Sequence, residues 1–157
     1  MIMKKIFIPL LFVFSFLWGC NKCYYLTLTD VTNRESPKLL LKIPVKIGEK
    51  FKICYTHSWD LTPVDDIFVI GKNGTIIIDE EIFNWFGAGL EHNPPRGKLF
   101  IGKDKRIHVK NINRNVKSFR LRVGIVANHR LVIKDKTIPL NSLTKPMNSI
   151  EFKIVKY

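Results

Sequence analysis

Two short segments of the 157-residue chain carry side chains that could do chemistry. The first, Tyr55 to Asp66, reads Tyr-Thr-His-Ser-Trp-Asp-Leu-Thr-Pro-Val-Asp-Asp and places a histidine and a serine among three carboxylates. A histidine beside a carboxylate can transfer protons or hold a ligand. The second, Phe86 to Leu90, reads Phe-Gly-Ala-Gly-Leu, and such a glycine turn can present backbone N–H groups to an anion. Each segment also has a purely structural interpretation, as a histidine pinned at a strand end and as a β-bulge or corner.

The pair His57-Ser58 does not form a hydrolase motif. Adjacent residues of a strand point to opposite faces, so the two side chains cannot act together inside a regular strand. The Gly-x-Ser-x-Gly elbow of many hydrolases is also absent from the sequence. A small hydrolase would therefore have to use His57 with Asp66 or His129, and this remains the alternative to a non-enzymatic protein. Among the carboxylates, Asp66 is expected to face His57, and Asp60 to cap the turn that follows it.

Later residues complete the candidate site. The guanidinium of Arg122 suits a carboxylate or phosphate group, unless it simply lies on a solvated strand face. No Cys/His spacing typical of zinc is present, and the aspartates match no standard calcium loop, so we expect neither metal nor cofactor. The candidate ligand- or partner-binding residues are Tyr55, His57, Ser58, Asp66, Gly87, Gly89, Arg122 and His129.

These residues must be positioned by β-strands, because apolar and polar residues alternate through most of the chain. No segment predicts an amphipathic helix longer than two turns. A strand over residues 51–58 places Tyr55 and His57 on one face. Asn73-Gly74 predicts a type I′ hairpin, and residues 111–117 a polar connector. About nine short strands separated by turn signals predict an all-β fold, an antiparallel β-sandwich or a partly open barrel.

The N-terminus has the features of an export signal. Lys4-Lys5 precedes an apolar run, residues 6–18, which is too short to span a bilayer comfortably. The run ends in Leu-Trp-Gly-Cys, with the cysteine at position 20, which resembles a bacterial lipoprotein cleavage site despite the bulky Trp18. We expect the acyl chains on Cys20 to anchor the protein at the outer face of the cytoplasmic membrane. An ordinary secretory signal and an uncleaved short anchor are the alternatives.

The expected organisation is a lipoprotein signal peptide over residues 1–19, a lipidated tether over 20–24 and one β-domain over 25–157. Two cysteines remain beyond the lipidated one. In an exported protein, Cys23 and Cys54 could form a disulfide or stay as two thiols.

The chain is strongly basic, with a formal net charge of +13. Its lysines are dispersed, which is typical of a solvated sheet face and also favours a surface beside anionic lipid or wall polymer. There is neither a recognition-helix pattern nor a basic–aromatic cluster, so nucleic acid is not an expected partner.

The motifs make the chain similar to an uncharacterised bacterial and archaeal family, domain of unknown function 1850 (DUF1850). Its members carry Tyr-x-His-Ser followed by Thr-Pro-Val and an acidic residue, then Phe-Gly-Ala-Gly-Leu, and later Arg-Val-Gly followed by histidine. The acid is often glutamate and a proline commonly follows Gly-Leu, whereas this chain has Asp65-Asp66 and Glu91. The resemblance extends over roughly residues 26–157. The matching positions are Tyr55, His57, Ser58, Thr62, Pro63, Val64, Asp66, residues 86–90, Arg122, Val123, Gly124 and His129.

The resemblance implies an accessory partner of TRAP-type transporters of the TAXI class, encoded beside or fused to the membrane subunits. It implies no enzymatic activity. We therefore expect an extracytoplasmic, lipid-anchored domain that assists such a transporter by binding its membrane subunit, its solute-binding protein or an anionic solute. A small hydrolase and a purely structural envelope lipoprotein are the alternatives.

Overall fold

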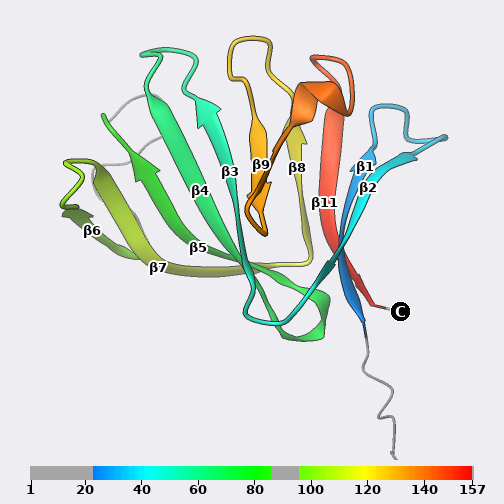
Figure 1. Ribbon diagram of the computed structural model, residues 1–157, viewed down its shortest axis with the longest axis horizontal. Helices are drawn as coiled ribbons and strands as arrows, with labels where there is room; N and C mark the ends of the chain where they lie inside the picture. Colours follow the sequence, from blue (N-terminus) through cyan, green and yellow to red (C-terminus); the bar gives the residue numbers. More distant parts are fainter. Residues whose placement is uncertain (1–22, 86–95, 157) are drawn as a thin grey trace, which may run out of the picture.

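A computed structural model of the protein describes residues 23–85 and 96–156, which fold into antiparallel β-strands joined by short turns (Figure 1). No α-helix of bilayer-spanning length and apolarity occurs in the described part of the chain. The strands are β1 (Tyr24–Asp30), β2 (Lys38–Val45), β3 (Lys50–Thr56), β4 (Pro63–Ile70), β5 (Ile76–Phe83), β6 (Lys98–Ile101), β7 (Ile107–Val116), β8 (Ser118–Arg122), β9 (Arg130–Ile133), β10 (Lys136–Pro139) and β11 (Ser149–Lys156).

The strands form two sheets, which confirms the predicted all-β, sandwich-like fold. The smaller sheet has four strands in the order β2-β1-β11-β8, and the larger has seven in the order β10-β9-β3-β4-β5-β7-β6. Figure 1 shows β5, β6 and β7 extending away from the side on which β1, β2, β8 and β11 lie. The larger sheet therefore offers more inner surface than the smaller sheet can cover.

Stacked aromatic rings join the two sheets. Phe51 of β3 stacks on Phe68 of β4, with ring centroids 4.9 Å apart. Phe68 stacks in turn on Phe119 of β8, and Phe119 on Phe152 of β11, both at 4.7 Å. Such offset contacts add to the apolar area that the rings remove from water. This ladder anchors the main core cluster, which also contains Leu26, Ile53, Ile70 and Leu131.

A second, smaller core cluster lies farther along the larger sheet. It consists of Val64, Phe83, Ile107 and Val109. Tyr55 packs against both clusters, so it marks the boundary between them.

The hairpin between β4 and β5 is formed as predicted. Asn73 and Gly74 have φ angles of +60° and +73°, the left-handed pair that a type I′ turn requires. The prediction of a polar connector over residues 111–117 is wrong, because β7 continues to Val116. Asn111 and Asn113 have positive φ angles, and residues 111–113 have no partner in the register of β5, which resumes at Arg114. These residues therefore form a bulge within β7 rather than a connector. An additional short strand, β10, had no clear sequence signal.

Candidate functional site

Four of the residues selected from the sequence line one cavity between the sheets. Tyr55 comes from β3, Asp66 from β4, Arg122 from β8 and His129 from the turn before β9. The cavity has a volume of about 590 Å³, within the range of small-molecule sites. Its polar lining is Tyr55, Asp66, Glu81, Arg114, Arg120, Arg122 and His129, and its apolar lining is Ile53, Phe68, Ile78, Ile112, Phe119 and Leu121. We call it the inter-sheet cavity.

Two carboxylates, those of Asp66 and Glu81, lie side by side in the lining of the inter-sheet cavity. We call the part of the lining that they form the floor of the cavity. Asp66 of β4 is directly opposite Glu81 of β5 in the strand register. Asp66 occupies an inward position between Val64 and Phe68, both of which are buried. Acidic residues therefore interrupt a face that is otherwise apolar. Like charges directly opposite each other destabilise a sheet, so this pair is not explained by strand pairing.

The surroundings of Asp66 favour its protonated form. Burial, followed by the negative charges of Glu81 and Asp65, raises its pKa to about 7. Burial also raises the pKa of the Tyr55 hydroxyl, and the charges of Asp66 and Glu81 add to that shift. The floor is thus a region of negative potential in which added negative charge is strongly disfavoured.

The ring of His129 is held in one orientation by a hydrogen bond within its own turn. The backbone N–H of Gly124 donates a hydrogen bond to His129 Nδ1 at 3.2 Å, and burial lowers the pKa of the imidazole. An accepting Nδ1 in a neutral ring leaves the proton on Nε2. The ring also packs on Tyr55, with centroids 5.4 Å apart. His129 is therefore a neutral hydrogen-bond donor fixed by its own turn.

Arginines supply the positive charge of the inter-sheet cavity. Arg114, Arg120 and Arg122 all line it and are all exposed. The Nε of Arg122 donates to the carbonyl of Met147 at 3.2 Å. Arg120 lies 3.6 Å from a carboxylate oxygen of Glu151. Glu151 faces away from the core on β11, so its contact holds the Arg120 guanidinium on the outer face of the smaller sheet. The N–H groups of Arg114 and the remaining N–H groups of Arg122 can bind an anion.

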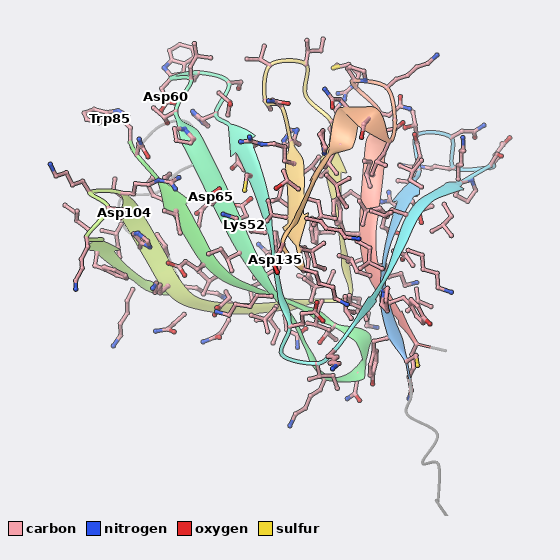
Figure 2. The ribbon with its side chains drawn as sticks, in the orientation of Figure 1. Lys52, Asp60, Asp65, Trp85, Asp104 and Asp135 are labelled. Carbon is pink, nitrogen blue, oxygen red and sulfur yellow. The ribbon has the colours of Figure 1, made fainter. Side chains whose placement is uncertain are left out.

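The structure does not bring His57 and Ser58 to the inter-sheet cavity. Ser58 is exposed, and His57 lies buried at the end of β3, where its Nδ1 is 3.0 Å from Asp60 Oδ1. Asp60 also accepts hydrogen bonds from the backbone and hydroxyl of Thr62, as expected for a turn cap. The expectation that Asp66 faces His57 is wrong, because the register pairs Asp66 with Ile53. Figure 2 shows Asp60 at the tip of the loop between β3 and β4.

A second polar cluster lies on the outer face of the larger sheet. Arg106 donates to Asp65 at 2.7 Å, to Asn84, and to the carbonyls of Pro63 and Ile82. Hydrogen bonds from Cys54 and Arg106 outweigh burial and lower the pKa of Asp65. The buried Cys54 is a free thiol, so the disulfide with Cys23 left open by the sequence is not formed.

His108 belongs to the same outer face. Its ring bridges two carboxylates, with Nδ1 2.7 Å from Glu80 and Nε2 3.0 Å from Asp104. Lys110 lies 3.5 Å from the same Glu80 oxygen. Every acid of this cluster thus has a cationic or protonatable partner (Figure 2 labels Asp65 and Asp104).

Three predicted positions, Cys20, Gly87 and Gly89, lie outside the described residues. Within residues 23–85 and 96–156, no group of three or more His, Cys, Asp or Glu side chains could hold a metal ion.

Sequence reasoning missed Glu81 and Arg114. A register shift between Ile78 and Glu80 in β5 decides that Glu81, rather than Glu80, faces inward, and alternation alone does not locate such a bulge. Arg114 belongs to the residues taken as a connector. For Asp66 the signal was present, since it interrupts the alternation Val64-x-Asp66-x-Phe68.

Comparison with known proteins gives a family but no characterised relative. No curated protein and no solved structure matches the chain significantly. A family model described as a domain of unknown function, DUF1850, matches residues 51–140. That segment contains β4 to β10 and all of β3 except Lys50, and it supplies every lining residue of the inter-sheet cavity. The chain therefore belongs to the DUF1850 family.

Proposed function

We propose that this domain binds a small solute bearing an anionic group in the inter-sheet cavity, and that it assists a TRAP-type transporter of the TAXI class. The observation that carries the proposal is the cavity itself, where Arg114, Arg122 and His129 converge from separate parts of the chain. A cavity that buries a small ligand with a few convergent polar groups is the usual form of a binding site.

The positive part of the lining supports the anionic group. A guanidinium can donate two parallel hydrogen bonds to a carboxylate, and both Arg114 and Arg122 are exposed enough to do so. The Nε2–H of His129 would add a neutral donor that needs no change of protonation on binding. Apolar side chains such as Phe68 and Phe119 complete the walls.

The cellular role rests on other observations. The apolar run that ends at Cys20 supports export and lipid anchoring at the outer face of the cytoplasmic membrane. The motifs shared with the family support the association with a transporter, through its membrane subunit or its solute-binding protein. A hydrolase built on His57 is not proposed, because this ring bonds to Asp60 and does not line the cavity.

Isothermal titration calorimetry with a panel of small carboxylates and amino acids tests the binding role. We expect at least one to bind, and Arg122→Gln to weaken that binding about tenfold or more, as loss of a charged hydrogen bond would. Arg130→Gln is the matched control, because Arg130 is exposed on β9 but does not line the cavity. An equal effect of both substitutions, or binding by neither the native protein nor the variants, would contradict this proposal.

Co-purification from the native membrane tests the transporter role separately. The tagged full-length protein should bring down the membrane subunit or the solute-binding protein of the transporter, and deletion should reduce uptake. Absence of both effects would leave the binding role standing and remove the transporter role.

A further inference from the structure

We propose that the solute bound in the inter-sheet cavity is amphoteric, an α-amino acid or a close analogue whose ammonium group is held by Asp66 and Glu81. This inference rests on the proposed function and deepens it, because it assigns a role to the side of the cavity that an anionic solute alone would not use. The juxtaposition that carries it is a carboxylate pair on β4 and β5 in the same cavity as arginines from β7 and β8.

The carboxylate pair is built as a site for a cation. Directly opposed residues on antiparallel strands have Cβ atoms roughly 5 Å apart, so one ammonium group can contact both Asp66 and Glu81. In the described part of the chain, the Asp66 carboxylate makes no hydrogen bond or ion pair with a protein cation. A ligand ammonium would offset the repulsion between the two acids and supply a hydrogen-bond donor to Asp66.

A purely anionic solute fits only part of the cavity. Bringing a second negative charge towards the acidic floor costs free energy in a partly desolvated site. A purely cationic solute has the converse difficulty at Arg114 and Arg122. A molecule with both charges satisfies both sets of side chains and specifies its own orientation, with the ammonium on the floor and the carboxylate at the arginines.

The apolar lining defines the rest of the ligand. Ile53, Ile78, Phe68 and Phe119 line the same cavity and have no polar side-chain atoms. They are suited to an aliphatic or aromatic side chain, which would gain roughly 25 cal/mol for each Å² removed from water. The structure thus favours apolar α-amino acids over small polar ones.

Matched probes test the two charges independently on the unmodified full-length protein. Alanine, leucine and phenylalanine are each titrated calorimetrically beside the carboxylate that lacks the ammonium group and the amine that lacks the carboxylate. These are propionate and ethylamine, isocaproate and isoamylamine, and hydrocinnamate and phenethylamine. We expect leucine or phenylalanine to bind at least tenfold more tightly than both of its analogues, and alanine to bind less tightly.

Substitution of one acid tests where the ammonium group binds. Glu81→Gln keeps the size of the side chain and should reduce the affinity for the amino acid to about that for its carboxylate analogue. Asp79→Asn is the control, because Asp79 also lies on β5 but pairs with Lys50 outside the cavity. Circular dichroism confirms that each variant is folded, and the comparison of probes on the native protein does not depend on any variant.

The outcomes separate this inference from the proposed function. A carboxylate analogue that binds as tightly as its amino acid would overturn the amphoteric ligand while leaving anion binding intact. Equal affinities of the Glu81→Gln and Asp79→Asn variants for the amino acid would overturn the role of the floor. Binding of none of the probes, together with no binding from the wider carboxylate panel, would overturn both proposals.

Discussion

Strands β4 and β5 carry two pairs of acids, one on each face of the larger sheet, and the surroundings of the two pairs differ. Asp65 and Glu80 point to the outer face, where Arg106 and His108 neutralise them at 2.7 Å. Their sequence neighbours Asp66 and Glu81 point inward and face each other. The pKa of Asp65 is lowered, whereas that of Asp66 is raised to about 7. The two pairs are adjacent in the sequence, so the difference between them comes from the face of the sheet on which each side chain lies.

The difference indicates which acids serve the fold. On the outer face, each carboxylate accepts charge-assisted hydrogen bonds, and removal of a partner would leave a costly unpaired group. On the inner face, an apolar pair would be more stable than two opposed acids. Departures from local consistency of this kind are typical of functional sites, which is why we assign the inner pair to a ligand.

The largest effect should follow from breaking the outer network. Arg106→Ala leaves Asp65 half-buried and without its cation, and frees the carbonyls of Pro63 and Ile82. We expect a loss of about 3 kcal/mol in the free energy of unfolding, the scale reported for one broken partner of a buried pair. Urea unfolding measures it. A loss below about 1 kcal/mol would show that the outer network is not structural.

Asp66 should make the protein less stable as pH rises. Its pKa of about 7 in the folded protein lies above the ordinary value of 3.8. Between pH 3.8 and pH 7 the native state therefore binds more protons than the unfolded chain, and the free energy of unfolding falls as the pH rises. The buried charge of Asp66 should lower the free energy of unfolding by about 2 kcal/mol above pH 7 and should have no effect below pH 4. This figure includes a reduction for the screening of the charge by water in the cavity. Asp66→Asn removes this cost.

Urea unfolding of Asp66→Asn at two pH values checks that sign. The variant should be more stable than the native protein near pH 8 and no more stable near pH 4. An equal difference between the two proteins at both pH values would contradict the assignment.

Substitutions of the two neighbouring acids on β5 should change the free energy of unfolding in opposite directions. Glu80→Gln weakens the contacts to His108 and Lys110 and should cost about 1.5 kcal/mol. Glu81→Gln removes one of two opposed charges and should stabilise the fold by about 0.5 kcal/mol. Chemical unfolding at neutral pH compares the two variants directly. Destabilisation by both would mean that the inner acid also supports the fold.

The last expected effect concerns the pH dependence of the His108 contacts. The hydrogen bond to Glu80, which outweighs burial, raises the pKa of His108 above 6.5. Its stabilising contribution, about 1 kcal/mol, is therefore complete below pH 6.5 and lost as pH rises through the raised folded pKa. His108→Gln should flatten the pH dependence in that window. An unchanged profile between about pH 6 and 9 would exclude this ion pair as a pH-dependent contact.

Particular residues show how far the sequence determines this picture. The alternation and the Asn73-Gly74 turn were sufficient to predict one hairpin and an all-β fold, with a sandwich and a partly open barrel as the two alternatives. Tyr55, Asp66, Arg122 and His129 were selected from sequence motifs, and the structure brings all four to one cavity. His57 was misplaced relative to Asp66, because a partner three residues away, Asp60, was available at lower entropic cost than a partner across the sheet.

Register accounts for what the sequence could not reveal. The bulge in β5 puts Glu81 inward and Glu80 outward, and the kinked β7 brings Arg114 to the cavity. A one-residue shift exchanges the faces of a strand, and such a shift depends on tertiary pairing rather than on local residue types. The outer partners of Asp65 and Glu80 were hidden for the same reason.

Scanning calorimetry of Glu81→Gln with and without a saturating amino-acid ligand, leucine or phenylalanine, tests the central claim most directly. The inner acids are proposed to serve binding at the expense of stability. Without ligand, the variant should therefore melt at a higher temperature than the native protein, and the ligand should raise its melting temperature by much less. A variant that melts lower than the native protein and keeps the full ligand-induced increase would contradict the claim.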